Sequence, residues 1–404
     1  MKVLHIIPSI AAVRGGPSQA IMAMVKALRE QGIKAEIATT NDNGLAVLDV
    51  PLHQLSDYQG VPVWFFPRFS PPIPAVREFA FSAAFTQWLW RSAANYDLLH
   101  IHAIFSYPST VAMAIARQQQ VPYIVRPLGQ LCAWSLQQRS LKKQLYLRLI
   151  ERQNLNHSQA LHLTSPQEEQ EVAQLKLKPP CFVLPHGLTL PVTQPNARDR
   201  LRQYLQVPGD EFIILFLSRL HPKKGLAYLL PALSQLTHRR FTFVLAGSGS
   251  PEYEAEVNKL LATCNLSERT HVAGLIAGAL KDLLLQGSDL FTLTSHSENF
   301  GIAVLEAMAA GLPVVVTPGV ALASVVADYQ LGDVAALDSA TIAATIEDYL
   351  DQPHLAKERG DRARQLVATH YTWKQIAVQL SQIYGSLLHP SSLPQPLHTV
   401  DYVP

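Results

Sequence analysis

The sequence predicts an α/β protein of two consecutive domains, each a doubly wound parallel sheet covered by helices, facing a central cleft. Three observations support this fold class. The chain has 404 residues, which is too long for one typical domain. Short β-branched runs alternate with longer helical patterns, as in a parallel sheet packed between helices. The alternation starts again after a polar, proline-containing stretch at residues 194–198.

The predicted elements follow one another in the order that this fold requires. In the first half, strands are expected at 2–7, 34–40, 61–66, 98–102, 123–126, 160–163 and 182–184. In the second half they are expected at 212–217, 241–245, 271–272, 289–293 and 312–316. Helical patterns lie between them, for example at 18–31, 111–119 and 226–236.

These elements predict a first domain at residues 1–190 and a second at 191–372. A last helix, 373–389, could cross back to the first domain. Residues 390–404 repeat proline and serine and are predicted to form a disordered tail. Ligands of doubly wound sheets bind at the carboxyl ends of the strands, so site residues are expected there.

The composition excludes several classes of protein. A formal charge of +2 with a pI near 8.3 is too balanced for binding nucleic acid through its phosphates. Cys132, Cys181 and Cys264 lie far apart, so they predict neither a disulfide framework nor a zinc site. His5 and Pro8 interrupt the first apolar run, which predicts a buried strand rather than a signal peptide. We expect a soluble, cytoplasmic protein, at most resting on the inner face of a membrane.

Two carboxylates flank a predicted helix start in the second half. Glu298 lies in a polar loop, and Glu306 lies within an alanine-rich helix that ends at Gly311. The free N–H groups at the start of this helix, near Gly301, can hold a phosphate. A carboxylate among alanines is costly unless it is paired. Glu306 is therefore a partly exposed helix residue, or it meets a nearby cation, or it accepts hydrogen bonds from ribose hydroxyls.

A basic loop follows the strand at 212–217. Arg219 and Lys224 are five residues apart in this loop and can converge on one pyrophosphate, whose negative charge grows as a sugar departs. A solvated basic loop is the alternative interpretation. Lys223 is the weaker candidate of the two lysines.

Glycine and histidine residues mark two strand ends in the first half. Gly15 and Gly16 form a turn where the backbone can approach a ligand closely, although an ordinary tight turn is an alternative. His100 and His102 point to one face of their strand and could bind a metal. No third ligand lies nearby in the sequence, so we expect no metal, and hydrogen-bonded core histidines are the alternative.

The segment around Glu298 and Glu306 resembles the donor-site signature of the family 4 retaining glycosyltransferases, which have the GT-B fold of two Rossmann-like domains. The resemblance rests on the spacing of the two carboxylates, on Asn-Phe-Gly after the first, and on Glu-Ala-Met-Ala-Ala-Gly-Leu-Pro at the second. It implies that Glu298 contacts the donor sugar and that Glu306 contacts the nucleotide ribose. The backbone of Asn299, Phe300 and Gly301 would approach the sugar and the pyrophosphate.

The same resemblance assigns roles to the other candidates. Arg219 and Lys224 would bind the donor phosphates, and Gly15 and Gly16 would face them across the cleft. Of the two strand-end histidines, His102 is the one expected to reach the donor sugar. The implied catalytic group is His102, Glu298, Arg219 and Lys224.

Two positions depart from the family pattern. The polysaccharide-assembly branch, which this half resembles, typically has Ser-Pro-His-Gly where this chain has Arg126, Pro127, Leu128 and Gly129. His186 stands where the family more often has asparagine. Arg126 and Gly129 are therefore weak candidates for contacts with the acceptor.

The expected function is a retaining transfer of a sugar from a UDP- or GDP-sugar to an acceptor hydroxyl in polysaccharide or glycolipid assembly, without metal or other cofactor. The first domain would hold a saccharide or lipid-linked acceptor, and the second would hold the nucleotide sugar. One alternative is a non-catalytic GT-B protein that binds a nucleotide sugar or partners an active transferase. Another is a GT-B relative such as an inverting transferase or an epimerase.

The helical segment 139–152 is basic and amphipathic. A solvated face over a core is one interpretation. A peripheral contact with anionic lipid is the other, and it would suit a lipid-linked acceptor.

Overall fold

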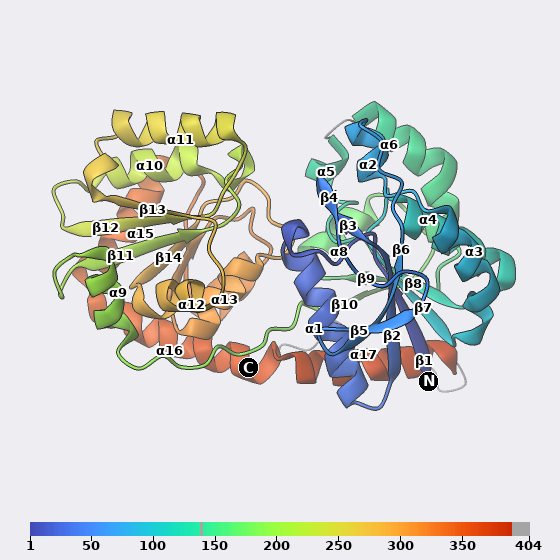
Figure 1. Ribbon diagram of the computed structural model, residues 1–404. Helices are drawn as coiled ribbons and strands as arrows, with labels where there is room; N and C mark the ends of the chain where they lie inside the picture. The colour runs from blue at the N-terminus through green and yellow to red at the C-terminus, as the bar shows by residue number, and fades with distance from the viewer. Residues whose placement is uncertain (138–139, 390–404) are drawn as a thin grey trace. The chain divides into compact units, whose positions relative to one another are not determined.

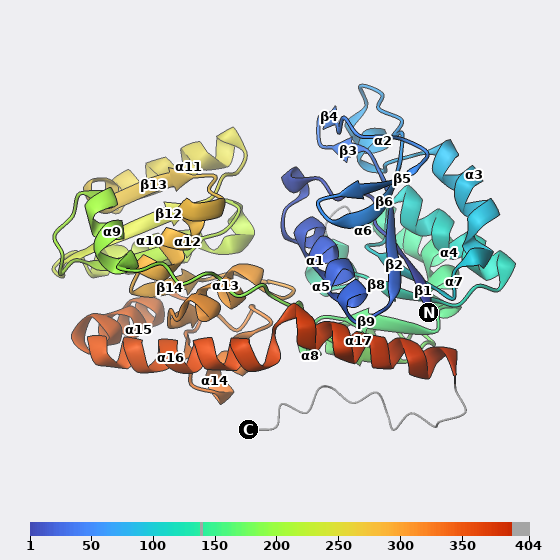
Figure 2. The ribbon, with the colours of Figure 1, turned by 60° about the horizontal axis from the view of Figure 1, so that its bottom comes forward.

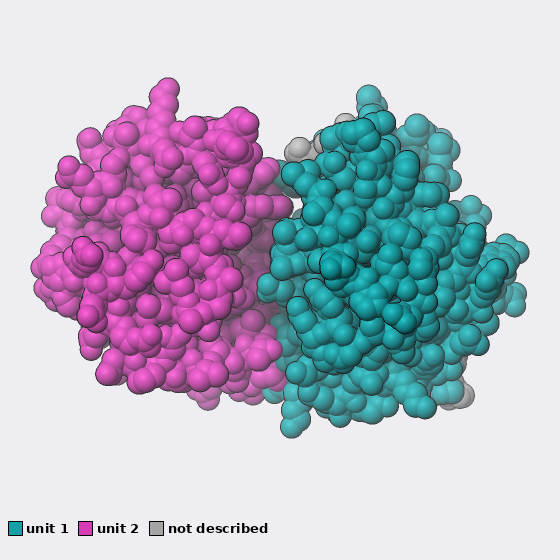
Figure 3. Space-filling model, viewed as in Figure 1, with its two compact units in different colours: residues 1–187, 373–404 teal, residues 188–372 magenta. Residues whose placement is uncertain are grey.

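A computed structural model describes residues 1–137 and 140–389. Arg139 of the predicted basic helix and the predicted tail, 390–404, lie outside the described residues. The chain divides into two compact units (Figure 3). The first comprises Met1–Gly187 together with the segment that begins at Trp373, and the second comprises Leu188–Thr372. The sequence placed the first boundary three residues later, after residue 190.

The first unit is built on an eight-stranded sheet in the order β10-β9-β8-β7-β1-β2-β6-β5. All neighbouring strands are parallel except β5 and β6, which form an antiparallel edge. The strands are β1 Lys2–Ile6, β2 Lys34–Thr40, β5 Leu55–Tyr58, β6 Val61–Phe66, β7 Leu98–His102, β8 Tyr123–Arg126, β9 Ala160–Leu163 and β10 Cys181–Val183.

Helices cover this sheet (Figure 1). They are α1 Gly16–Glu30, α2 Pro74–Glu78, α3 Ala83–Ser92, α4 Tyr107–Gln119, α5 Ala133–Gln137, α6 Ser140–Tyr146, α7 Arg152–Asn156, α8 Pro166–Ala173 and α17 Trp373–Leu388, with a π-helical stretch at Leu147–Glu151. The last of these, α17, packs beside α1 (Figure 2). Its Ile376, Leu380 and Tyr384 are fully buried in the core formed with α1 and the sheet. The final helix therefore completes the hydrophobic core of the first unit.

The second unit has a six-stranded, fully parallel sheet in the order β13-β12-β11-β14-β15-β16. This is the strand order of the Rossmann fold. The strands are β11 Phe212–Leu217, β12 Phe241–Ala246, β13 Thr270–Gly274, β14 Leu290–Leu293, β15 Val314–Val316 and β16 Gly332–Val334. The helices are α9 Ala197–Leu205, α10 Leu226–Gln235, α11 Pro251–Thr263, α12 Gly278–Gly287, α13 Ile302–Ala310, α14 Ala323–Asp328, α15 Ser339–Asp351 and α16 Pro353–His370.

The predicted fold class of two Rossmann-like domains is confirmed, and every strand predicted from the sequence is present within two residues of its expected bounds. The sequence missed β5 and β16, among others. β5 is a polar edge strand, Leu-Ser-Asp-Tyr, and β16 is only three residues long and begins with glycine. Neither has the β-branched run by which a strand is recognised.

Each sheet reverses its strand order at one point. In the first unit β1 lies between β7 and β2, and in the second β11 lies between β14 and β12. The loops after the two strands on either side of such a reversal leave in opposite directions, so that their carboxyl ends form a crevice that binds ligands.

Candidate active site

In the second unit, the loops after β11 and β14 bring Lys224 to Glu298. The ammonium group of Lys224 forms an ion pair with the carboxylate of Glu298, and both side chains are largely shielded from solvent. Glu298 is held from its backbone as well. Its N–H donates to the carbonyl of Gly319 at 2.7 Å, and its carbonyl accepts from the N–H of Ala321 at 3.0 Å. The loop after β11, through Lys224, and the loop after β15, through Gly319 and Ala321, therefore both position Glu298.

The approach of these loops depends on Gly225. Its φ of 72° lies in the left-handed region, and a Cβ added there would lie 1.8 Å from the carbonyl oxygen of Thr294. Beside it, the N–H of His296 donates to the carbonyl of Lys223 at 2.9 Å. Any other residue at position 225 would push the two loops apart and separate Lys224 from Glu298.

The second carboxylate, Glu306, lies in α13 and accepts from Lys281 of α12 at 2.8 Å. The predicted contact of Glu306 with a nearby cation is thus present, and its contact with the nucleotide ribose stays a prediction. Sequence analysis missed Lys281, since nothing near it distinguishes it from a surface lysine. A side chain at an ion pair of this exposure remains able to exchange its partner for a ligand hydroxyl.

The start of α13 carries the other predicted donor contacts. Gly301 is the residue before the helix, with a φ of 93° that favours glycine. Phe300 is buried and Asn299 half-buried in the loop that leads to it. Arg219 is exposed at the carboxyl end of β11, and no ion pair joins it to another residue in the described parts of the chain. Its guanidinium is thus available to an anionic ligand.

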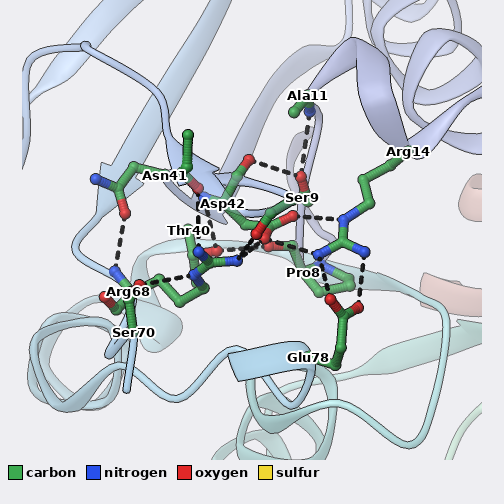
Figure 4. A network of polar contacts seen from close by, with 12 residues as sticks. Pro8, Ser9, Ala11, Arg14, Thr40, Asn41, Asp42, Arg68, Ser70 and Glu78 are labelled. Carbon is green, nitrogen blue, oxygen red and sulfur yellow. Dashed lines mark hydrogen bonds and ion pairs between the residues drawn. The ribbon is translucent and has the colours of Figure 1, made fainter. Parts of the chain in front are cut away.

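In the first unit, a network of charges holds the turn that contains Gly15 and Gly16 (Figure 4). Arg14, directly before the turn, donates to both oxygens of Asp42 at 2.7 and 2.8 Å and to Glu78 at 2.7 Å. Burial alone would raise the pKa of Asp42, but the bonds from Arg14 and Ser9 and the charges of Arg14 and Arg68 hold that pKa below its usual value.

The turn itself is open. Gly15 has a φ of 78°, and a Cβ added there would meet no atom within 4 Å. The backbone conformation, rather than lack of space, therefore calls for glycine at this position. Sequence analysis missed the charge network because Asp42 and Glu78 lie 28 and 64 residues from Arg14.

The two strand-end histidines belong to a buried cluster of imidazoles. His102 lies 3.0 Å from His5, between Nε2 and Nδ1. His100 accepts at Nδ1 from the hydroxyl of Tyr384 of α17 at 2.6 Å, and its Nε2 lies 3.3 Å from Nδ1 of His162. His162 in turn contacts the carbonyl of Leu184 at 2.9 Å.

His5, on β1, is a third imidazole beside His100 and His102, and the sequence did not reveal that it lies there. The ligand nitrogens of His5, His100 and His102 lie within 4.8 Å of one another. The signal was present in the alternation of β1, where position 5 is polar between apolar neighbours, but the pairing of β1 with β7 was needed to interpret it. His102 is enclosed in this structure, so its assignment to the donor sugar stays a prediction.

Burial makes these imidazoles neutral. It lowers the pKa of His5 to about 3, with a further contribution from the charge of Arg126. The pKa values of His100, His102, His162 and His186 also lie well below the usual value, because of burial first and of neighbouring groups second.

The weak acceptor-side candidates lie beside this cluster. Arg126 ends β8 and is paired in register with His102 of β7, and its side chain is fully buried. Gly129 has a φ of 74°, and its N–H donates to Glu168 at 2.7 Å. The structure therefore brings His102 and Arg126 together at one strand end of the first unit.

Comparison with solved structures places the chain in the GT-B class of two Rossmann-like domains. A sucrose-phosphate synthase from Thermosynechococcus elongatus matches with a TM-score of 0.78 at 22% identity, over 97% of this chain and 100% of that one. The Anabaena protein Alr3699/HepE, solved with UDP and glucose, matches with a TM-score of 0.73 at 20% identity, over 96% of this chain and 100% of that one. These similarities show the fold.

Two family models then define the family. Residues 15–187 match the glycosyl transferase 4-like domain, and residues 197–366 match the glycosyl transferases group 1. The chain belongs to the family 4 glycosyltransferases of GT-B type. Among curated relatives, the glycogen synthase of Mycobacterium tuberculosis is 31% identical over 190 residues, covering 45% of this chain and 44% of that protein. The match thus spans less than half of that relative's length.

No helix in the described parts of the chain is long and apolar enough to cross a membrane.

The neutral histidine cluster predicts a stability that depends on pH. An unfolded imidazole takes up a proton near pH 6.5, whereas the buried ones stay neutral well below it. The stability of the first unit is therefore fully present above about pH 6.5 and is lost as the pH falls. Each such histidine costs about 1.4 kcal/mol per pH unit in that window.

All five tryptophans lie in the first unit, so tryptophan fluorescence during urea unfolding reports on it alone. The slope of the free energy of unfolding against pH reports the number of protons taken up on unfolding. Between pH 6.5 and 5, the substitution His5→Asn should reduce this number by about one. The exposed His157, changed to Gln, serves as the control and should leave the slope unchanged. An unchanged slope in His5→Asn would show that His5 is not neutral in the folded state.

Proposed function

We propose that this protein is a retaining glycosyltransferase that moves a sugar from a nucleoside-diphosphate sugar to an acceptor hydroxyl, in polysaccharide or glycolipid assembly. The observation that carries the proposal is the ion pair of Lys224 with Glu298 at the strand-order reversal of the second sheet, with Arg219 at the same edge. Nucleotides bind to sheets of this kind at the same edge, so the two cationic side chains and the carboxylate there support the proposal.

The donor is bound through groups that differ in charge. Glu306 accepts hydrogen bonds from the ribose hydroxyls, in exchange for its contact with Lys281. The start of α13 and the cations of Arg219 and Lys224 hold the pyrophosphate. Lys224 keeps Glu298 ionised and oriented, so that this carboxylate accepts from hydroxyls of the sugar. In the first unit, the proposal assigns Gly15 and Gly16 to the donor phosphate, and His102 to a contact with the donor sugar.

The chemical step needs stabilisation of a departing diphosphate. As the bond between C1 and the phosphate oxygen breaks, negative charge grows on that oxygen, and Lys224 and Arg219 stabilise it. The acceptor hydroxyl attacks the same face of the oxocarbenium-like sugar, and the leaving phosphate takes its proton. Both glutamates bind hydroxyls, so neither acts as a nucleophile. Attack by the acceptor hydroxyl on the same face does not require one. The residues present supply the positive charge for which other transferases use a metal.

A uridine nucleotide is the first donor to test, since the similar Anabaena protein was solved with UDP and glucose. A non-catalytic protein that binds a nucleotide sugar remains the alternative, and turnover distinguishes the two. Analysis of the product anomer separates a retaining transferase from an inverting one.

The change Glu306→Gln should weaken nucleotide-sugar binding by about tenfold to a hundredfold, because a charged acceptor of the ribose hydroxyls is lost. Calorimetry with a panel of UDP- and GDP-sugars, without added metal, measures this effect. The exposed Glu358, on α16, is a matched control as Glu358→Gln. If no nucleotide sugar binds the unchanged protein, the proposed function is wrong.

The change Lys224→Met should lower kcat by about a hundredfold or more, since it removes a cation from the leaving group. Lys223→Met is the matched control, because Lys223 is the adjacent lysine, whereas Lys224 forms the ion pair with Glu298. Release of free nucleotide from the donor identified above gives kcat for both variants. Equal losses in the two variants would argue against a specific role for Lys224.

We further propose that the first unit contacts anionic membrane through α6 and the π-helical stretch after it. Leu141, Leu145 and Leu149 recur every four residues, and each is more than half exposed. Lys142 and Arg148 beside them are exposed, and residues 140–150 contain no acidic residue. An exposed apolar stripe flanked by basic residues is typical of a helix that lies in a membrane interface.

A second exposed apolar group adjoins the stripe. Phe79 packs edge-on against Tyr146 of α6, with ring centroids 6.1 Å apart. The segment around Phe79 exposes Phe69, Ile73, Val76 and Phe81. The combined surface would bring a lipid-linked acceptor to the first unit.

The double change Leu145→Ser and Leu149→Ser should abolish flotation of the protein with vesicles that contain anionic phospholipid at low salt. Binding should also weaken as salt rises, because basic residues contribute to it. Leu275→Ser, at a leucine of the second unit that is more exposed than either, is the control. Equal flotation of the double variant and the unchanged protein would refute the membrane contact.

A further inference from the structure

The described residues contain three buried arginines, and two of them form an ion pair with an aspartate. Arg68 pairs with Asp42 and donates to the carbonyls of Gly44 and Ala46 (Figure 4). Arg202 pairs with Asp289 and donates to the carbonyls of Arg198, Gly287 and Glu211, leaving only its Nε without a partner. In both of these arginines a carboxylate compensates the buried charge, as the cost of burying an ion requires.

Arg126 is the exception. Its one hydrogen bond to a described residue runs from Nη2 to Nδ1 of the neutral His186, at the long distance of 3.3 Å. Its Nε has no acceptor among the described residues, and no carboxylate among them forms an ion pair with it. Arg126 is nevertheless only 1% exposed, so water outside the protein does not solvate its charge.

The nearest negative charge is committed elsewhere. Glu168 acts on Arg126 through space. Its two oxygens already accept from the N–H of Gly129 at 2.7 Å and from the N–H and hydroxyl of Thr164, both at 2.8 Å. Burial lowers the pKa of Arg126 to about 10, which leaves the guanidinium charged at neutral pH. A buried, charged donor therefore has no carboxylate acceptor of its own among the described residues.

The imidazoles around Arg126 do not neutralise it. His5, His102, His162 and His186 all lie close enough for its charge to lower their pKa values, so each is a neutral neighbour. His5 adds a second unpartnered polar atom, because its Nε2 is buried without a hydrogen bond to any described residue. With its proton on Nε2, His5 is a second donor beside the guanidinium.

The sign of the charge decides which ion this cluster can take. Three imidazole nitrogens within 4.8 Å of one another would also suit a transition metal. A metal dication would, however, add to the charge of Arg126 in a buried site that contains no free carboxylate. An anion supplies the missing acceptor and compensates the charge, so electrostatics favours the anion.

We propose that Arg126, with His5 beside it, forms a subsite for an oxyanion, either a carboxylate or a phosphate group. Arg126 ends β8 next to His102, at the edge of the sheet where ligands bind. Because Arg126 and His5 are enclosed, the subsite takes a small charged group rather than a whole sugar ring. The assignment of this group to the acceptor rests on the proposed function, whereas binding of the anion does not.

The test measures anion binding directly on the full chain. Calorimetry and thermal unfolding, in a buffer without phosphate, sulfate or carboxylate, compare inorganic phosphate, acetate, glucose 6-phosphate, glucuronate and glucose. We expect the anions to bind and to raise the unfolding temperature, and glucose alone to do neither. Tighter binding of the two anionic sugars identifies the oxyanion as part of an acceptor, and tighter binding of the inorganic ions identifies a free ion.

Arg126→Gln should weaken anion binding at least about tenfold. The anion affinity of Arg126→Lys should lie between those of Arg126→Gln and the unchanged protein, since lysine keeps the charge but loses the forked geometry of the guanidinium. Arg91→Gln, at an exposed arginine of the same unit, is the control. Without anion, Arg126→Gln should unfold at no lower temperature than the unchanged protein, because an uncompensated charge is removed.

Two results would overturn the proposal. One is a lower unfolding temperature of Arg126→Gln with unchanged anion binding, which would make Arg126 structural. The other is a crystal structure grown in phosphate with ordered water alone against Nε of Arg126. Binding of a UDP-sugar to the unchanged protein is measured separately. Absence of anion binding would also overturn this proposal, and absence of nucleotide-sugar binding the proposed function, so the two failures are distinguishable.

Discussion

The loops that follow β11 and β14 can meet because residue 225 has no side chain. A Cβ at this position would clash with the carbonyl oxygen of Thr294. The backbone also has a positive φ here, where the two strand ends converge, and glycine adopts that conformation most readily. The ion pair of Lys224 and Glu298 depends on that contact, since the two residues flank it in the sequence and come from loops about 70 residues apart. The backbone bonds of Glu298 to Gly319 and Ala321 then tie the third loop, after β15, to the same place. The geometry of this strand-end site is thus built largely from backbone, and the charged side chains are added to a frame that is already fixed.

The two units handle charge at their strand ends in different ways. In the second unit, each candidate carboxylate is paired with a lysine, and both pairs keep a small exposed fraction. In the first unit, the corresponding edge is lined by neutral imidazoles and by the buried guanidinium of Arg126, which has no carboxylate partner within residues 1–137 and 140–389. A charge without a counter-charge destabilises the folded state strongly there, because the surroundings have a low dielectric constant. For the same reason, the proposed subsite at Arg126 would favour anions over neutral ligands. The tyrosine that binds His100 comes from α17, so the last helix of the chain is part of this polar core as well as of the apolar one.

The strands and the positions of most site residues followed from local pattern. Parallel strands buried on both faces are continuous apolar runs, and loops with glycine and charge follow them, so Arg219, Lys224, Glu298 and Glu306 could be placed at strand and helix ends. The edge strand β5 and the short β16 escaped because pairing, rather than composition, makes them strands. Lys281, Asp42, Glu78 and His5 escaped for a related reason. Each is an ordinary residue in its own segment, and its role arises from a partner that is distant in the sequence.

The sequence by itself determined the two Rossmann-like domains and the donor-side motif, because hydrophobic periodicity and the spacing from Glu298 to Glu306 are local properties that survive without the fold. Only the tertiary structure decided the state of the candidate side chains. It showed that Glu306 meets Lys281, that His100 and His102 are joined by His5 and His162, and that Arg126 is buried without a carboxylate partner among the described residues. Strand pairing brings these groups together, and burial then sets their charge, since the cost of leaving water depends on neighbours that no single segment of the chain contains.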